Sequence, residues 1–170
     1  MFTIIFERIF LDKHFLVHIK KVIKLGNIKI RKLSECDLES VAALYKLFWN
    51  DNQNIDKMKV KFNELKSNTN YIFLCATVDD QVVGTIMGII CEEMYGDCKP
   101  FLIMEDLVVH EKFRKFKIGS LLLGDLEKIG KENDCTQIVF LTESDRRETL
   151  SFYENLGFNL KSHIGFKKKL

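Results

Sequence analysis

Two adjacent carboxylates followed by a cationic turn form the first stretch of this sequence that could carry chemistry. Glu105 and Asp106 stand inside the apolar run FLIMEDLVV (101–109). The next residues, HEKFRKFKIGS (110–120), are basic and lead into an apolar, helix-like run. A positioned carboxylate can take a proton from a nucleophile, and the unpaired N–H groups of a helix start can hold an anion such as a phosphate. The pattern indicates proton transfer beside an anion-binding turn.

A plain structural role for the turn competes with anion binding. Its cationic side chains could simply be solvated, and Gly119 could simply begin a helix. If the turn binds an anion, Gly119 would let the backbone approach the ligand closely and Ser120 would add a hydroxyl group. A Walker-type phosphate loop is excluded because the spacing GxxxxGK[ST] is absent. The turn alone does not decide between the two roles.

The two carboxylates also leave a choice open. Side chains alternate along a β-strand, so only one of Glu105 and Asp106 is expected to face an acceptor molecule. The other would then be a structural acid.

The elements that must position these groups follow one another regularly. Alternating or continuous apolar runs predict strands, namely 28–33, 71–78, 81–91, 101–109, 136–142 and a last strand leading to the C-terminus. Helical spacing and caps predict helices over about 34–49, over a short segment ending near residue 67, over 119–133 and over 147–156. Asp79 and Asp80 should form a tight hairpin turn, and Gly157 should end the last helix in a left-handed conformation.

Composition indicates a single globular domain. The chain has 170 residues, of which 46% are hydrophobic and 29% charged, which is ordinary for a globular protein. A formal net charge of +2 is too small to indicate nucleic acid as a partner. Five widely spaced cysteines without a CxxC pair indicate free thiols in a reducing cytoplasm and no metal site.

Residues 1–27 form an apolar extension before this domain. Charges interrupt every window of the roughly 20 apolar residues that a membrane span needs, so no span is expected, and a secretory signal is not indicated. The spacing suits one or two amphipathic helices, and a β-hairpin stays possible. We favour packing of this extension on the domain, or a subunit contact in a homodimer, over adhesion to a membrane surface.

Two motifs resemble the signatures of the GNAT superfamily of N-acetyltransferases. VHEKFRKFKIGSLL (109–122) is similar to the acetyl-CoA motif, whose core is [RQ]-x-x-G-x-[GA], with Arg114 in the first position and Gly119 in the last. SFYENLGF (151–158) is similar to the second signature, F-Y-x-x-x-G-F. Lys117 stands where the family usually has its first glycine, and Arg146 where it often has asparagine.

The resemblance implies the fold. The order of the expected elements matches the family from about residue 28 to 170, which would form one N-acetyltransferase domain of the α/β (α+β) class. Its central sheet would be mixed but mostly antiparallel, with six to seven strands flanked by helices.

The resemblance also implies roles for particular residues. Glu105 would be the catalytic base and Tyr153 the acid that protonates the leaving thiolate. Acetyl-CoA would be the cosubstrate, with no metal, and its pantetheine would pair with the backbone of Leu107, Val108 and Val109. The residues expected around its pyrophosphate are Arg114, Lys115, Phe116, Lys117, Ile118, Gly119 and Ser120.

The motifs define the molecule that accepts the acetyl group less closely than they define the cosubstrate. The segments WNDNQNID (49–56) and CEEMYGDC (91–98) border the acceptor cleft in the family, and their acids favour a cationic primary amine, small or peptidic. Trp49, Glu92 and Asp106 are the expected acceptor-binding residues. The alternative is a catalytically degenerate CoA-binding or protein-interaction module, which Lys117 and Arg146 favour. A nucleotide-binding regulatory domain ranks last because no metal-binding signature accompanies the turn.

Overall fold

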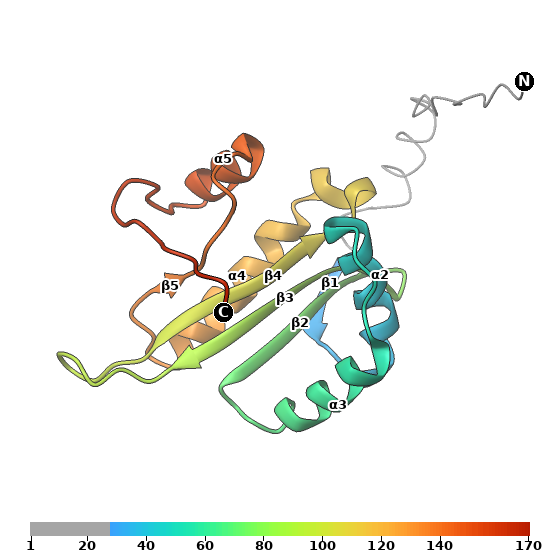
Figure 1. The fold of residues 1–170 in the computed structure, drawn as a ribbon, viewed down its shortest axis with the longest axis horizontal. Helices are drawn as coiled ribbons and strands as arrows, with labels where there is room; N and C mark the ends of the chain where they lie inside the picture. The colour runs from blue at the N-terminus through green and yellow to red at the C-terminus, as the bar shows by residue number, and fades with distance from the viewer. Residues whose placement is uncertain (1–27) are drawn as a thin grey trace, which may run out of the picture.

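A five-stranded sheet forms the centre of the computed structural model, which describes residues 28–170 (Figure 1). The spatial order is β1-β2-β3-β4-β5; the first four strands are antiparallel to their neighbours, and β5 is parallel to β4. The strands are β1 (Ile28–Lys32), β2 (Tyr71–Val78), β3 (Gln81–Cys91), β4 (Phe101–Val109) and β5 (Ile138–Val139).

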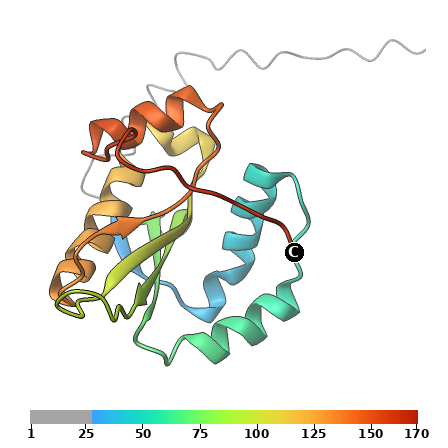
Figure 2. The same cartoon turned by 60° about the vertical axis from the view of Figure 1, so that its left-hand side comes forward.

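Helices cover both faces of this sheet. The α-helices are α2 (Leu38–Trp49), α3 (Ile55–Leu65), α4 (Ile118–Glu132) and α5 (Arg147–Asn155), with 3-10 turns η2 (Glu35–Asp37) and η3 (Glu111–Phe116). α4 lies against one face and α2 against the other (Figure 2). Gly88 of β3 faces α4, since a Cβ built on it would lie only 2.5 Å from Leu126 Cδ1. The missing side chain lets α4 approach the sheet closely.

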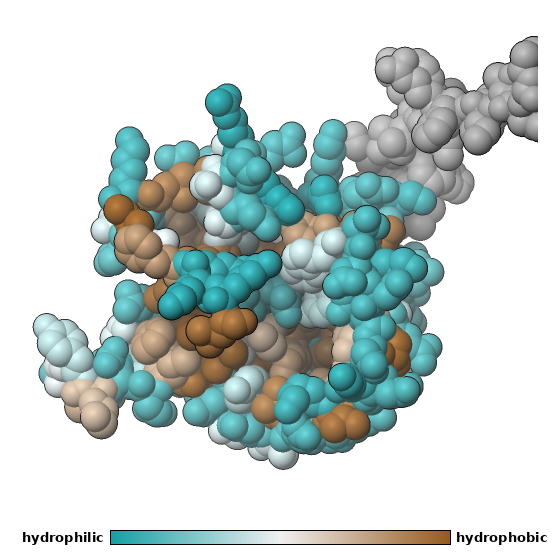
Figure 3. Space-filling view, in the orientation of Figure 1, coloured by the Kyte–Doolittle hydropathy of each residue, from teal (hydrophilic) through white to brown (hydrophobic). Residues whose placement is uncertain are grey.

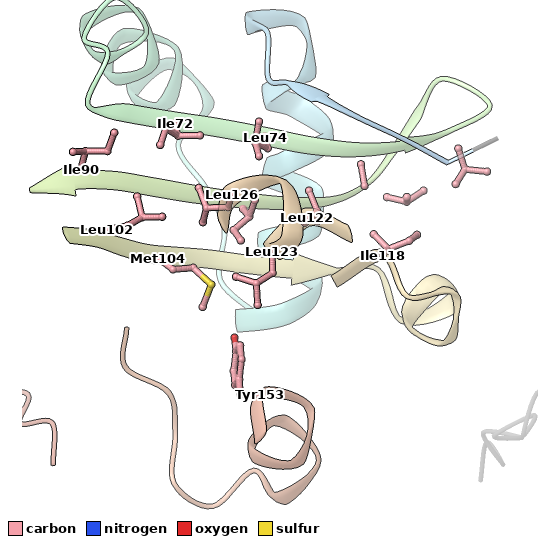
Figure 4. Packing of buried hydrophobic residues seen from close by; sticks show 14 residues of the cluster. Ile72, Leu74, Ile90, Leu102, Met104, Ile118, Leu122, Leu123, Leu126 and Tyr153 are labelled. Atoms are coloured by element: carbon pink, nitrogen blue, oxygen red, sulfur yellow. The ribbon is translucent and has the colours of Figure 1, made fainter. Parts of the chain in front are cut away.

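The main core lies between α4 and the sheet (Figure 4). Ile118, Leu122 and Leu126 are fully buried, and their spacing of four residues forms the apolar face of an amphipathic helix. β2 and β3 are apolar along most of their length because helices cover both of their faces.

A partly buried ion pair fixes the start of α2 to β1. Arg31 donates two hydrogen bonds to the Asp37 carboxylate, at 2.7 and 2.8 Å. These bonds hold the pKa of Asp37 well below its usual range. Ser34 also donates to this carboxylate, so the expected helix start at Ser34 is confirmed, with one 3-10 turn before α2.

Four strands, a hairpin turn, the residue that ends α5 and the free cysteines agree with the expectation. The strands β1 to β4 match the expected ranges closely, and Asp79 and Asp80 form the hairpin turn, with φ of 48° and 62°. Gly157 has a φ of 91° directly after α5. All five cysteines are free. Within residues 28–170, no helix combines the length and apolarity needed to cross a membrane.

The expected number of strands is wrong for the described residues. The sheet has five strands rather than six to seven. The run 136–142 pairs with β4 only at Ile138 and Val139, because β5 then turns away from its neighbour. Residues 159–170, expected to contain a last strand, form no strand and are exposed. The expectations for residues 1–27 lie outside the described part of the chain.

Candidate active site

β4 contains an extra residue at the carboxylate pair. Glu105 lies opposite Met87 of β3, whereas Val108 lies opposite Thr85. Between these pairs β3 has one residue, Ile86, and β4 has two, so the strand is bulged. Asp106 takes up the bulge with a φ of 55°, in the left-handed region.

The bulge places both carboxylates on the same side of the sheet. Because Gly88 faces α4, its neighbour Met87 faces away from α4, and so does Glu105 opposite it. Asp106 is held on this same side, since its Oδ2 accepts a hydrogen bond of 3.2 Å from the Tyr45 hydroxyl of α2. Strict alternation, which would leave one acid on each face, is wrong across this stretch.

Burial makes both acids more basic, and repulsion by Asp106 adds to this effect at Glu105. Burial raises the pKa of Glu105, and the negative charge of Asp106 raises it further. Burial also raises the pKa of Asp106, while the hydrogen bond from Tyr45 opposes this effect. The pKa of Tyr45 lies well above its usual range because of its burial and the adjacent Asp106 charge. Tyr45 therefore donates a stable hydrogen bond.

β4 and β5 part just before the two acids. Their pairing consists of Leu102 with Ile138 and Ile103 with Val139, and it ends there. Figure 1 shows β5 leading away from β4 toward α5. The β5-facing edge of β4 therefore has no strand partner from Met104 to Val109 among the described residues. An extended ligand could pair with such an edge in the way an added strand does.

Tyr153 projects from α5 toward the sheet (Figure 4). Its side chain is only 7% exposed, and its ring packs against Phe140 at a centroid distance of 4.4 Å and against Phe158 at 5.7 Å. Burial raises the pKa of Tyr153 to about 12, so the hydroxyl is protonated near neutral pH.

The basic turn ends in free helix amides. The first backbone hydrogen bond of α4 runs from Leu121 N–H to the Lys117 carbonyl, at 3.0 Å. The N–H groups of Ile118, Gly119 and Ser120 have no backbone acceptor within the described chain. Ile118 is fully buried, whereas Gly119 and Ser120 are partly exposed, so the amides of these two residues are the ones that a ligand can reach.

Gly119 and Lys117 each have a structural role at the start of α4. A Cβ on Gly119 would lie 3.1 Å from Phe152 Cζ, so this glycine makes room for the aromatic ring of the second motif. The residue with a left-handed backbone is Lys117, with φ of 60° and ψ of 16°. The two motifs, far apart in sequence, therefore meet at the start of α4.

Of the other expected site residues, some lie near the carboxylate pair and one lies far from it. Arg114 donates from Nε to the Val109 carbonyl at 3.3 Å and lines a shallow cleft between β4 and α2. Trp49 packs edge-on to Tyr45 at 5.0 Å and is 42% exposed. Glu92 follows the end of β3, roughly 17 Å along the strand from Met87 at about 3.4 Å per residue. The structure does not bring it to the carboxylate pair.

Sequence reasoning missed two aromatic residues of α2. Tyr45 lies on the helix expected over about 34–49, and its hydroxyl binds Asp106. Phe48 lines the cleft, and the Arg146 guanidinium lies 4.8 Å from its ring centroid. Arg146 also pairs with Glu143 at 3.0 Å. The signal for Tyr45 was a hydroxyl that needs a partner on a buried helix face; nothing in the sequence indicated Phe48.

Comparison with known proteins defines the class. Residues 38–158 match the Acetyltransferase (GNAT) family, so the chain belongs to the GNAT acetyltransferases, a family that uses acetyl-CoA as cosubstrate. Among residues 28–170, no cluster of three or more His, Cys, Asp or Glu side chains could hold a metal ion.

Solved structures share this fold. A transcriptional regulator from Bacillus halodurans C-125 superimposes with a TM-score of 0.76 at 25% identity, covering 84% of this chain and 99% of that one. Glucosamine-6-phosphate N-acetyltransferase from Arabidopsis thaliana gives 0.71 at 21% identity, covering 83% and 97%. An aminoglycoside antibiotic 6'-N-acetyltransferase from Acinetobacter baumannii gives 0.69 at 23% identity, covering 84% and 98%.

The backbone of Lys117 gives the first testable prediction. A left-handed conformation costs a non-glycine residue roughly 1–2 kcal/mol, and glycine avoids this cost at the expense of a more flexible unfolded chain. We expect Lys117→Gly to raise the free energy of unfolding by about 0.5–1 kcal/mol, measured by urea denaturation. Lys115→Gly, an equal charge change within η3, should lower it. A Lys117→Gly variant less stable than the wild type would contradict the backbone assignment.

Proposed function

We propose that this chain transfers an acetyl group from acetyl-CoA to a cationic primary amine, such as a polyamine, an aminoglycoside or a lysine side chain. The observation that carries the proposal is the parting of β4 and β5 beside the bulged pair Glu105–Asp106. β4 provides the open strand edge and the pair of acids. α5 provides the protonated Tyr153.

The chain offers acetyl-CoA a continuous set of backbone groups. The unpaired edge of β4 at Leu107, Val108 and Val109 suits the amide groups of pantetheine. The free amides at the start of α4 suit the pyrophosphate, because they combine unpaired donors with the positive end of the helix dipole. Bound there, acetyl-CoA supplies an activated acetyl thioester.

Glu105 is suited to remove the proton that prevents the acceptor amine from acting as a nucleophile. An amine with a pKa of ~10.4 is neutral in only about 1 molecule in 2,500 at pH 7, a deficit of about 4.6 kcal/mol. A carboxylate can remove the proton as the amine attacks. Because burial raises the pKa of Glu105, this carboxylate is a stronger base than an ordinary glutamate. We assign Glu105 as the base, and Asp106 as the acid that orients the cation, since Tyr45 already occupies Asp106.

Tyr153 is suited to protonate the leaving thiolate. Its hydroxyl keeps its proton at neutral pH, because burial raises its pKa to about 12. A thiol with a pKa of ~8.5 lies about 1.5 units above neutrality, so protonation at departure is worth about 2 kcal/mol.

The acceptor class rests on charge. Both carboxylates lie on the face that α2 partly covers, and two acids on one face favour a cation over a neutral or anionic acceptor. Two proteins with this fold carry names that specify amine acceptors, glucosamine-6-phosphate and an aminoglycoside antibiotic. Their likeness supports an amine and leaves its identity to experiment.

A second candidate is a binding module without catalysis. Arg146 stands at the usual asparagine position and is engaged by Glu143 and Phe48, so it is not free to contact the cofactor in the same way. A protein of this fold is named a transcriptional regulator. The module would bind CoA and acetylate no amine.

The carboxylate pair gives the second prediction. We expect Glu105→Gln to reduce kcat by about 10²–10⁴-fold at pH 7, measured as CoA release with spermidine as acceptor. Asp106→Asn should mainly raise KM for the amine. The kcat of the wild type should fall as the pH drops through the pKa of Glu105, which lies above the ordinary value. The Glu105→Gln variant should recover as pH approaches the pKa of the amine. Equal kcat losses in both variants would contradict the assignment.

The third prediction concerns Tyr153. We expect Tyr153→Phe to lower kcat by up to about 30-fold, the equivalent of about 2 kcal/mol, without abolishing turnover. Tyr95→Phe changes an exposed tyrosine in the same way and should have no effect. A change confined to KM, with kcat unaltered, would show that Tyr153 is a packing residue and not a proton donor.

A further inference from the structure

α5 carries Tyr153, yet strand pairing does not attach this helix to the sheet. Pairing between β4 and β5 ends at Val139, and within the described chain the backbone hydrogen bonds of residues 140–158 stay inside that segment. The segment after α5 adds little support, because residues 159–170 are exposed. Figure 3, in the orientation of Figure 1, shows hydrophilic atoms crossing apolar surface where this segment runs. Side-chain contacts therefore fix α5 relative to the carboxylate pair.

One such contact joins the start of α5 to α2. The guanidinium of Arg146, the residue directly before α5, lies 4.8 Å from the ring centroid of Phe48 on α2. Glu143 accepts an ion pair from the same guanidinium at 3.0 Å. Among the hydrogen bonds, ion pairs and ring contacts of the described residues, the Arg146–Phe48 contact is the one that joins residues 140–158 to α2. It links the β5 side of the opening to a helix that packs on β4.

The ring of Phe48 also belongs to a series of contacts that reaches the carboxylate pair. Phe48 packs edge-on against Trp49 at a centroid distance of 4.9 Å, and Trp49 packs edge-on against Tyr45 at 5.0 Å. Tyr45 donates its hydrogen bond to Asp106. Residues three apart on a helix are neighbours on its surface. α2 therefore contacts the carboxylate pair through Tyr45 and the start of α5 through Phe48, within one helical turn.

Arg146 is joined to Tyr153 through the backbone of α5. The Arg146 carbonyl accepts a hydrogen bond of 3.0 Å from Leu150 N–H, so this residue is fixed to the first turn of the helix. Tyr153 follows seven residues later, which is about two helical turns and returns to the same side of the helix. The Arg146 side chain makes no capping hydrogen bond. Its contacts with Phe48 and Glu143 are thus separate from the formation of the helix.

We propose that Arg146 is a positioning residue, which places the Tyr153 hydroxyl for proton donation by tying α5 to Phe48 of α2. The inference rests on the proposed function, in which Tyr153 protonates the leaving thiolate. A proton donor must lie within hydrogen-bond reach of the atom that it protonates, so the position of α5 affects the rate. This role differs from the cofactor contact that the family's usual asparagine would make at the same position.

Double-mutant kinetics test the inference on the full chain. Values of kcat and KM are measured with acetyl-CoA and spermidine for Arg146→Gln, Phe48→Leu and Tyr153→Phe. Two double variants combine each of the first two changes with Tyr153→Phe. Arg147→Gln is the matched control, because it removes the same charge from the next residue, which makes no ring contact or ion pair within residues 28–170.

The expected losses are modest and specific to proton donation. The Arg146 side chain is 40% exposed, and a cation–π contact at an exposed site shifts an equilibrium by roughly two- to fivefold. We expect Arg146→Gln and Phe48→Leu each to lower kcat by about this factor, with KM for acetyl-CoA unchanged. In the Tyr153→Phe background neither change should lower kcat further, because proton donation is already lost. Arg147→Gln should match the wild type.

Hydrogen exchange of the α5 amides gives a second readout that does not depend on catalysis. A helix of nine residues is unstable on its own, so its amides exchange when it leaves the body of the protein. We expect exchange to be about two- to fivefold faster in Arg146→Gln and Phe48→Leu. It should be unchanged in Arg147→Gln, and Phe48→Tyr, which keeps the ring, should change it less than Phe48→Leu does.

Each other outcome overturns the inference in a distinguishable way. Unchanged kcat and unchanged α5 exchange in Arg146→Gln would remove the positioning role and leave the proposed function intact. A further fall of kcat in the Tyr153→Phe background would mean that Arg146 does not act through Tyr153. A raised KM for acetyl-CoA in Arg146→Gln alone would make this arginine a cofactor contact. A wild type that acetylates neither spermidine, an aminoglycoside nor a lysine peptide would overturn the proposed function and this inference together.

Discussion

The bulge in β4 is the constraint on which the site depends. One extra residue, Asp106, adopts a left-handed backbone that costs a non-glycine residue roughly 1–2 kcal/mol. The hydrogen bond from Tyr45 holds its carboxylate in place, so α2 contributes directly to keeping the bulge. In a regular strand the two acids would point to opposite faces, one of them into the α4 core. The bulge instead collects two negative charges on one side.

The same bulge accompanies the parting of the sheet. Pairing between β4 and β5 ends at Ile103, just before the bulged stretch, and bulged strands bend and twist more strongly than regular ones. The open edge and the acids therefore arise together. Behind them, Gly119 and Phe152 pack where α5 meets the start of α4, so the helix that carries Tyr153 is positioned against the anion-binding turn.

The sequence predicted the larger elements well because their signals are local. Four strands, the hairpin at Asp79 and Asp80, and the caps of the helices follow from apolar periodicity and turn chemistry. The bulge was not predictable in this way, since a strand with one extra residue has the same composition as one without. The strand count failed for a related reason: the run 136–142 and the tail have strand-like residues, but a strand also needs a partner to pair with. The contacts of Tyr45 with Asp106 and of Phe48 with Arg146 join distant segments and leave no local pattern.

The most direct test of the account is a thermal-shift titration with acetyl-CoA, with CoA and ATP as comparison ligands. A ligand at 100 times its dissociation constant stabilises the folded state by about 2.7 kcal/mol. We expect a saturable rise in Tm with acetyl-CoA and CoA, and a much smaller one with ATP, because the β4 edge beyond Ile103 recognises pantetheine and ATP has none. No shift at millimolar acetyl-CoA, or an equal shift with ATP, would contradict the claim that the opening between β4 and β5 is an acetyl-CoA site.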